Sequence, residues 1–311
     1  MRVTSNTFTN DLLDQLNTLT SRQAQLQNQA ASGQRIQSPE DDPGAARRVL
    51  DLQTEGAAVA QYQKNIARQQ EQATASYSAM KSLKTVSDRA NEIAILADGL
   101  KSPLDLPNYA SEVTSLIKQA VQWANTKDQG NYLFAGTLSN QPPFAMTTDA
   151  AGHVTAVTYQ GNTTLAESEI AESVTTSAQT TGENATGSGP RGLIADSRVG
   201  ADLFNHLISL QNNLLSANSA AISATDVPAL AKDEDNLLFH FSANGAVQAR
   251  LEASASMAAN RGSSLQKLVS GEADADLAQT LVRLNQTQTA YQAALQSAGK
   301  VLSMSLLDFL H

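Results

Sequence analysis

Three glycines near residue 190 have the spacing of a dinucleotide-binding loop. Gly187, Gly189 and Gly192 match the pattern GxGxxG, in which glycines let the backbone approach a pyrophosphate at the start of a helix. That chemistry requires a strand immediately before the glycines. Residues 181–186 instead have the composition of a loop, and Pro190 lies inside the pattern. The sequence therefore predicts turns here, not a nucleotide site.

The titratable side chains do not form a pattern that supports catalysis or metal binding. The chain has no cysteine, which excludes thiolate nucleophiles, disulfide bonds and cysteine-ligated metals. Its histidines show no HExxH or similar ligand spacing; they are His153, His206, His240 and His311. No GxSxG motif and no phosphate-binding P-loop is present in the sequence. We therefore predict a protein that is not an enzyme and has no cofactor and no metal.

One dense group of acids is explained by helix capping. It belongs to a turn and cap motif made of Ser38, Pro39, Asp41, Asp42 and Pro43. Asp42 followed by Pro43 is typical of an N-cap with proline at the first helical position. The acids, Glu40 included, would then lie at the positive end of the helix dipole. Because no further ligand stands at calcium-loop spacing, capping is a better interpretation than a metal site.

Both ends of the chain carry apolar residues in alternating steps of four and three, which is the repeat of a coiled-coil seam. Near the start, the leucines of this repeat are Leu12, Leu16, Leu19 and Leu26. Near the end, the repeat comprises Leu277, Leu281, Leu284, Tyr291, Leu295, Ala298 and Leu302, and it closes with Leu306 and Phe309. Gln288 is its polar interruption. Two seams at opposite ends predict that the terminal helices pair and that these residues form an assembly interface.

The residues that flank the C-terminal seam are nearly free of charge. Between Leu277 and Phe309 the charged residues are Arg283, Lys300 and Asp308, and the other polar positions hold Gln, Asn, Ser and Thr. A coiled coil that faces water usually has Glu and Lys at its flanking positions. One seam also buries too little apolar surface to offset the entropy lost when two helices are ordered. We therefore expect these ends to be loose in the free protein and to fold when companion molecules surround them.

The composition restricts the partners. The net charge is −9 and no basic stripe is present, which argues against a nucleic acid as partner. No run approaches 18 apolar residues, so membrane insertion is not expected. The first residues contain no apolar segment of the kind that a secretory signal requires. If the protein is exported, we expect it to leave without a cleaved signal peptide.

Helical periodicity continues between the two ends. A repeat without proline predicts one long helix from Asp42 to about Gly99. A second helix follows and contains the single tryptophan of the chain, Trp123, which we expect to pack between helices. The helical pattern returns near Asp196 and again after Pro228.

The composition changes within this helical framework. Residues 138–195 are rich in Thr, Ser, Gly and Ala with a strand-like alternation, which predicts a small β-rich outer domain. Residues 38–137 with 196–274 would form a helical rod domain, and residues 1–37 with 275–311 a terminal coiled-coil assembly domain. The predicted fold class is mainly α. It is a long antiparallel helical hairpin or coiled coil built from both termini, with a small β-rich insertion.

Several separated motifs make the chain resemble a known family. They are SGQRIQSPEDDPGAARRVLDLQ at residues 32–53, ANTKDQGNYLFAGT at 124–137 with PPF shortly after, YQGN at 159–162 and SLLDFL at 305–310. In this order they resemble the flagellin-like family of flagellar hook-filament junction proteins, the hook-associated protein 3 family. The resemblance covers both ends and the helical parts, whereas residues 138–195 match only loosely.

The resemblance implies a structural adaptor that joins the hook of the bacterial flagellum to the flagellin filament. It implies that residues 1–35 and 275–311 form an inner helical layer that lines the export channel, and that residues 138–195 face outward. The implied partners are further copies in a ring of subunits, hook-associated protein 1, flagellin, an export chaperone that holds the C-terminal helix, and the type III export apparatus. The implied location is extracellular, at the hook-filament junction.

Two other functions stay open on the sequence alone. A flagellin-type filament subunit shares the paired termini and an SGxRI element followed by two aspartates. The prolines on either side of the acids, Pro39 and Pro43, and the NYLFAG element before residue 138 favour the junction family instead. An exported coiled-coil effector would need a long apolar hairpin able to enter membranes, and the sequence contains none.

Overall fold

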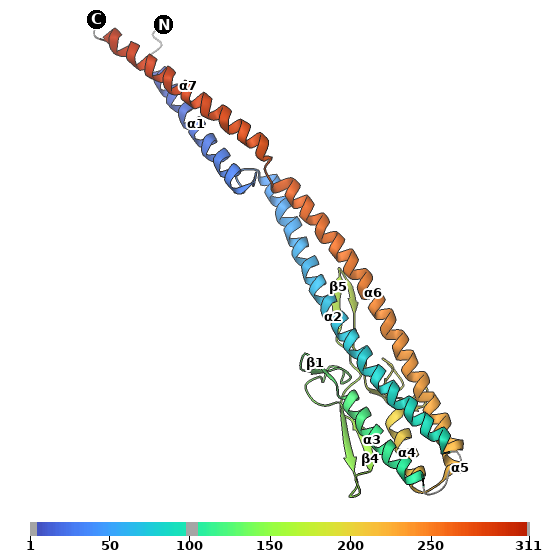
Figure 1. Ribbon diagram of the computed structural model, residues 1–311. Helices are drawn as coiled ribbons and strands as arrows, with labels where there is room; N and C mark the ends of the chain where they lie inside the picture. Colours follow the sequence, from blue (N-terminus) through green and yellow to red (C-terminus); the bar gives the residue numbers. More distant parts are fainter. Residues whose placement is uncertain (1–4, 98–104, 310–311) are drawn as a thin grey trace. The chain divides into compact units, whose positions relative to one another are not determined.

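Long helices make up most of the protein. The computed structural model describes the backbone of residues 5–97 and 105–309, and the side chains of residues 10–97 and 105–300. The helices are α1 (Ser5–Ser32), α2 (Pro43–Leu96), α3 (Leu106–Ala124), α4 (Leu203–Leu215), α5 (Ser219–Ala221), α6 (Val227–Ala273) and α7 (Leu277–Phe309), with a π-helical turn η1 (Ile222–Asp226) before α6 (Figure 1). The mainly helical fold class predicted from the sequence is confirmed.

The strands are short and pair mostly with their neighbours in sequence. They are β1 (Lys127–Asp128), β2 (Asn131–Tyr132), β3 (Phe144–Thr148), β4 (Val154–Tyr159), β5 (Ser168–Ala171), β6 (Val174–Thr176), β7 (Glu183–Asn184), β8 (Ala195–Asp196) and β9 (Ala201–Asp202). β1–β2, β3–β4 and β5–β6 are antiparallel hairpins. β8 lies between β7, to which it is parallel, and β9, to which it is antiparallel. These pieces hold loops in place and do not form one large sheet.

The contacts divide the chain into two units. The first contains residues 1–59 and 260–311, and the second contains residues 60–259. In the first unit α1 and α7 pack side by side and run antiparallel (Figure 1). The predicted pairing of the two terminal helices is therefore confirmed.

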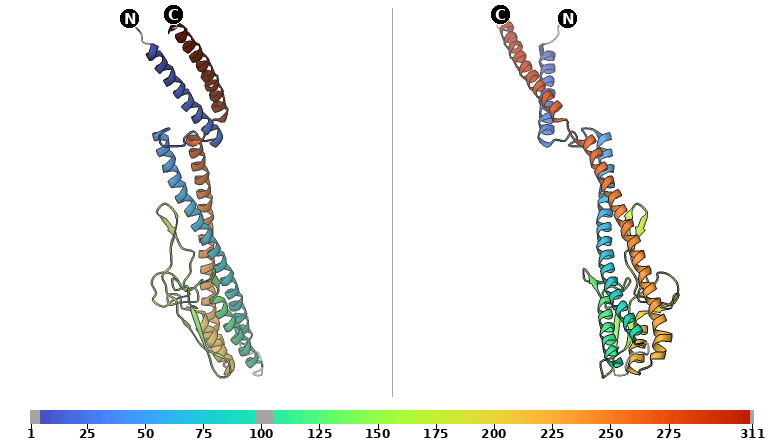
Figure 2. Two further views of the ribbon diagram at one scale, coloured as in Figure 1. Left: turned by 90° about the vertical axis from the view of Figure 1, so that its left-hand side faces the viewer. Right: turned by 45° about the vertical axis from the view of Figure 1, so that its right-hand side comes forward.

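The second unit has a conventional apolar core. Its centre is formed by fully buried side chains from α2, α3 and α4, among them Met80, Ile117 and Leu207. Phe134 from the loop after β2 is also fully buried there. A smaller cluster of Ile66, Ile170 and Leu251 joins the β5–β6 hairpin to α2 and α6. The strands and loops lie on one side of the helices of this unit (Figure 2).

Two details differ from the sequence prediction. Trp123 does not pack between helices, because 41% of its surface is exposed. The buried stripe of α3 runs through Val113, Ile117, Ala120 and Ala124, and position 123 falls beside that stripe. The helix expected near residue 196 begins only at Leu203, since the residues before it form β8, a turn and β9.

A buried glutamine joins three elements of the second unit. The side chain of Gln211, on α4, accepts hydrogen bonds from the hydroxyl of Thr114 at 2.7 Å and from the amide of Val154 at 3.3 Å. Its Nε2 donates to the carbonyl oxygen of Val154 at 3.0 Å. One side chain thereby connects α4 to α3 and to β4. An amide buried in this way has to keep its partners, because water cannot replace them.

The substitution Gln211→Ala should destabilise the second unit. It would leave the Thr114 hydroxyl and the Val154 backbone groups without this partner, so we expect the free energy of unfolding to fall by about 2–4 kcal/mol. Urea unfolding followed by circular dichroism measures the change. The matched control is Asn212→Ala, at the next, exposed position of the same helix. Equal effects of the two substitutions would contradict the structural role of Gln211.

Candidate assembly interface

The packed face of α1 is the seam that its spacing predicts. Leu12, Leu16 and Leu19 are half-buried, and Leu26 is buried. Leu13, one position beyond the seam, is exposed. The four-three repeat therefore identifies which side of α1 packs against α7.

The packed face of α7 differs from the predicted seam. At every second position of the repeat, the packed residue lies one place earlier in the sequence than predicted. Its buried and half-buried positions follow the steps of four and three through Thr280, Leu284, Thr287, Tyr291, Ala294 and Ala298. Leu284, Tyr291 and Ala298 belong to both patterns, whereas Thr280, Thr287 and Ala294 take the places predicted for Leu281, Gln288 and Leu295. Small side chains on α7 allow the leucines of α1 to approach closely. The hydroxyl of Thr287 donates to the carbonyl oxygen of Arg283 at 2.8 Å, so its burial leaves no unpaired donor.

This shift leaves three leucines of α7 in contact with solvent. The exposed fractions are 48% for Leu277, 50% for Leu281 and 45% for Leu295. They lie on one flank of the packed face and continue the repeat through the half-buried Gln288. α7 therefore has two adjacent seams, one packed against α1 and one uncovered by the described residues of this chain.

The turn between α1 and α2 is joined to the turn between α6 and α7 by backbone hydrogen bonds. The amide of Arg35 donates to the carbonyl oxygen of Ala273 at 2.7 Å, and the amide of Ala275 donates to that of Gly33 at 2.8 Å. Gly33 has a φ of +70°, a conformation that favours glycine and ends α1. The two bonds fix which residues of α1 lie beside which residues of α7.

Charged side chains reinforce this backbone link. Nη2 of Arg35 donates to the carbonyl oxygen of Glu272 at 2.7 Å, and its Nη1 contacts Oδ2 of Asp42 at 3.1 Å. The guanidinium of Arg48 binds both carboxylate oxygens of Glu272, at 3.1 and 2.9 Å. The hydrogen bonds and charge of Arg48 lower the pKa of Glu272. We call this group of residues, 33–48 with 272–275, the turn junction.

The acids of the cap motif lie within the turn junction. Oδ1 of Asp42 accepts a hydrogen bond from the amide of Ala45 at 3.0 Å, which is N-cap geometry. Oδ2 of Asp41 accepts from the amides of Ser38 and Gln37 at 3.0 and 2.9 Å. These backbone donors are the main reason that the pKa of each carboxyl is lowered. Both acids therefore act as ionised caps for local backbone amides.

The structure describes the side chains of most residues predicted for the interface. The packed ones are Leu12, Leu16, Leu19, Leu26, Leu284 and Tyr291; the exposed ones are Leu277, Leu281 and Leu295. The side chains of Leu302, Leu306 and Phe309 lie outside the described residues. The turn and cap residues Ser38, Pro39, Asp41, Asp42 and Pro43 lie together at the start of α2. Sequence reasoning missed the partners Arg35 and Glu272, which are 237 residues apart.

The glycine pattern near residue 190 forms a folded loop. Gly187 and Gly189 have φ values of +73° and +79°. A Cβ added at Gly192 would lie 2.1 Å from the carbonyl oxygen of Ala195, so the backbone itself occupies that space. These glycines therefore lie in turns, as the sequence predicts.

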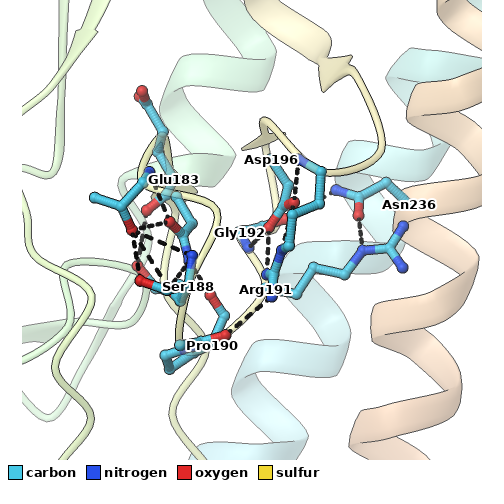
Figure 3. Close-up of polar contacts among 12 residues, drawn as sticks. Glu183, Ser188, Pro190, Arg191, Gly192, Asp196 and Asn236 are labelled. Carbon is cyan, nitrogen blue, oxygen red and sulfur yellow. Dashed lines mark hydrogen bonds and ion pairs between the residues drawn. The ribbon is translucent and has the colours of Figure 1, made fainter.

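Side chains hold this loop through its backbone groups. Nδ2 of Asn236, from α6, donates to the carbonyl oxygens of Gly192 and Leu193 at 2.9 and 2.8 Å (Figure 3). The Asp196 carboxylate accepts from the amide of Gly192 and pairs with Arg198 at 2.6 Å. Burial alone would raise the pKa of Asp196, but these partners lower it to about 2. The loop is thus fixed by polar contacts without regular structure.

Two histidines of the second unit have pKa values shifted in opposite directions. Burial lowers the pKa of His240 to about 4, although its Nε2 contacts the carbonyl oxygen of Gly192 at 3.1 Å. Burial also acts to lower the pKa of His206, but the hydrogen bond of 2.8 Å to Asp233 and the charge of that residue raise it overall. His206 therefore stabilises the fold below pH 6.5 and loses this effect as the pH rises through its raised pKa. His240 has the opposite effect. The fold loses stability as the pH falls below 6.5, because burial disfavours the protonated form of His240.

No group of three or more histidine, aspartate or glutamate side chains within the described residues could hold a metal ion. Across the same part of the chain, none of the helices combines the length and apolarity needed to cross a membrane.

The N-terminal part of the chain matches a known family. Residues 3–139 match the family described as the bacterial flagellin N-terminal helical region. This match, the paired terminal helices and the motifs of the sequence agree. The resemblance to the flagellin-like family is confirmed.

The individual relatives are named as flagellar hook-associated proteins or as FlgL. Flagellar hook-associated protein 3 of Escherichia coli (strain K12) is 29% identical over 119 residues, a match that covers 38% of this chain and 38% of that relative's length. A hook-associated protein candidate from Vibrio parahaemolyticus shares the fold with a TM-score of 0.64 and 21% identity over 75% of this chain and all of that chain. FlgL of Bacillus cereus gives a TM-score of 0.56 and 18% identity over 71% of this chain and 99% of that one.

The substitution Arg35→Ala should loosen the turn junction without unfolding the protein. It removes the charge-assisted hydrogen bond to the Glu272 carbonyl and the contact with Asp42. We expect amide hydrogen exchange at residues 273–275 to become roughly tenfold faster. Mass spectrometry of exchanged peptides measures this rate. The control is Arg47→Ala, because Arg47 is exposed and has no ion-pair partner among the described residues. Exchange that matches the control would contradict the role of Arg35.

The substitution His240→Gln should reduce the acid sensitivity of the fold. In the unfolded chain the histidine binds a proton near pH 6.5, whereas in the folded protein it does so only near pH 4. As the pH falls from 6.5 to 4, the free energy of unfolding of the parent protein should therefore decrease by up to roughly 3 kcal/mol. The decrease should be smaller in the variant. Urea unfolding at pH 7, 5.5 and 4 tests this. His153→Gln, at a half-buried position in the turn before β4, is the control. Parallel curves for parent and His240→Gln would show the prediction to be wrong.

Proposed function

We propose that this protein is a structural adaptor of the bacterial flagellum that joins the hook to the flagellin filament. Its terminal helices would be covered by neighbouring copies in a ring of subunits. The main support for the proposal is the leucine seam on α7, which the described residues leave uncovered. The fold that contains this seam is shared with a flagellar junction protein. The names of the Escherichia coli relative and of a Legionella pneumophila junction protein with this fold support the same role.

The uncovered seam has the properties of an interface between subunits. Leu277, Leu281 and Leu295 are each about half exposed. Covering a leucine fully is worth about 1.5–3 kcal/mol, so a neighbour that covers this seam gains a substantial part of that value at each position. The flanking Gln, Ser and Thr residues carry no charge that would repel an identical neighbour. We infer that the ends of the free protein are only weakly held and become fully ordered on assembly.

The proposed layout assigns a role to each part of the chain. Residues 1–37 and 275–311 form the assembly domain that would line the export channel. Residues 38–137 and 196–274 form the rod domain, and residues 138–195 form the outer domain. Hook-associated protein 1 and flagellin would contact opposite ends of the ring. An export chaperone would cover the apolar face of α7 before export through the type III apparatus.

This role requires no catalysis. An adaptor acts through its surfaces, and we propose that the protein has no enzymatic activity.

A flagellin-type filament subunit is the second candidate. The match of residues 3–139 to the flagellin N-terminal region favours it, because that region is named for flagellin itself. Loss of the protein separates the two roles. Cells without a junction protein would keep hooks, lack filaments and release flagellin monomers to the medium, whereas loss of a minor flagellin would leave filaments in place.

Substitutions on the uncovered seam should abolish assembly without unfolding the monomer. We expect Leu281→Ser with Leu295→Ser to change the free energy of unfolding by less than about 1 kcal/mol, because exposed positions contribute little to the fold. In cells that lack the native copy, this variant should fail to restore filaments seen by electron microscopy. Gln286→Ser with Gln292→Ser, at exposed polar positions of the same helix, should restore them. A seam variant that restores filaments would contradict the proposed interface.

A further inference from the structure

The segment after α3 carries side chains that are common at the centres of protein interfaces. Trp123 and Leu138 are exposed, and the ammonium of Lys127 lies 4.6 Å from the centre of the Tyr132 ring. The backbone connects them, because the Thr126 hydroxyl donates to the carbonyl oxygen of Trp123 and the Tyr132 amide donates to that of Ser139. Tryptophan, tyrosine and arginine dominate binding hot spots. Trp123, which is partly exposed and lies beside the buried stripe of α3, is therefore a candidate contact.

The β1–β2 hairpin in this segment is preformed. Its turn has Gln129 and Gly130 at φ values of +46° and +88°. Nε2 of Gln129 donates to Oε2 of Glu71 on α2 at 2.8 Å, which ties the turn to the helix. A surface already in its bound conformation loses little entropy on binding.

A polar pocket lies between this hairpin and α2. Its volume is about 360 Å³, and its lining includes Arg68, Gln72, Asn131 and Tyr132. The guanidinium of Arg68 has no hydrogen bond or ion pair with the described residues. Asp128 also lines the pocket, so an incoming carboxylate would be held on the Arg68 side. Arginine with neighbouring amide donors suits a carboxylate, which it can bind with two parallel hydrogen bonds.

The β5–β6 hairpin has the complementary chemistry. Glu172 lies in its turn, is exposed, and has no hydrogen bond or ion pair within the described part of the chain. The turn is held by Ser173, whose φ is +58° and whose amide donates to Oε1 of Glu169 at 3.1 Å. Val174 beside it is exposed. The hairpin therefore presents an unpaired carboxylate next to an apolar side chain.

We propose that the β5–β6 hairpin of one copy docks at the β1–β2 hairpin of the next. Glu172 would pair with Arg68 of the neighbour, and Val174 would cover Trp123. Rings are built from contacts between two different surfaces of the same chain, and this pair of surfaces meets that requirement. The inference rests on the proposed ring of subunits and names a contact within it.

The two surfaces are displaced along α2. The β5–β6 hairpin is anchored at Asn65, whose Nδ2 donates to the carbonyl oxygen of Glu169 at 2.8 Å, whereas the β1–β2 hairpin is anchored at Glu71. β5 and β1 lie at different levels along this helix (Figure 1). Six helical residues correspond to roughly 9 Å. Neighbouring copies should therefore be offset along the direction of α2, and a closed ring accommodates such an offset when α2 is inclined to the ring axis.

Charge reversal tests the contact in cells that lack the native copy. Arg68→Glu and Glu172→Lys should each reduce the fraction of cells with filaments about tenfold, because each places like charges together. The double variant Arg68→Glu with Glu172→Lys should restore this fraction to near the parent value. Lys64→Glu, one turn before Arg68 and also exposed, is the matched control and should have little effect. Normal filaments in both single variants, or a double variant no better than either one, would overturn the proposal.

Cross-linking tests the same contact without relying on the cellular role. The chain contains no cysteine, so purified full-length Arg68→Cys and Glu172→Cys proteins can be mixed at high concentration and oxidised. Disulfide-linked dimers should form in the mixture and not in either protein alone, and acrylamide should quench Trp123 less in the dimer than in the monomer. Absence of mixed dimers would overturn the contact.

If cells without the protein lack filaments but neither rescue nor cross-linking occurs, the junction role stands and this contact is wrong. If those cells keep normal filaments, the junction role is wrong and the cross-linking result still decides the contact.

Discussion

The antiparallel bridge between Gly33 and Ala275 and between Arg35 and Ala273 is the constraint on which the first unit depends. It connects two turns that are more than two hundred residues apart in sequence and thereby sets the register of α1 against α7. A change of register by one residue would place different side chains of α7 against the leucines of α1. The ion pairs around the bridge are partly exposed, so they orient the turns more than they stabilise them.

The two units use different physical means of packing. The second unit buries large apolar side chains such as Met80, Ile117 and Leu207 and has the core of an ordinary domain. In the first unit, leucines of α1 meet threonine and alanine of α7, and Leu277, Leu281 and Leu295 of the α7 repeat remain exposed. An element with so little buried apolar surface depends on additional contacts for its stability. This difference supports our proposal that assembly orders the ends, because only the second unit has a large apolar core of its own.

The region with little regular structure is held by side chains that satisfy backbone groups. Asn236, Asp196 and Gln211 each bind backbone amides or carbonyls of segments that lack long strands. A composition of threonine, serine and glycine buries too little apolar area to fix a loop by itself, so buried amides and carboxylates supply the specificity. Other side chains hold the two hairpins in the same way: Nε2 of Gln129, in the β1–β2 turn, donates to Glu71, and Nδ2 of Asn65 donates to the carbonyl oxygen of Glu169 in β5.

The sequence alone determined that the ends form helices and pair, that α2 begins at Pro43, and that Leu12, Leu16, Leu19 and Leu26 form one face, because periodicity and capping are local properties. It also determined the flagellin-like resemblance through separated motifs. It did not determine which of two adjacent repeats on α7 packs, since residues 280 and 281 differ by only one position and the leucine pattern favours the wrong one. Tertiary structure decided this point, because the register is set by hydrogen bonds between residues 33–35 and 273–275 that no local pattern encodes. The same holds for Trp123 and Arg68, whose exposure follows from how α3 and the hairpins pack and not from their own neighbours in the sequence.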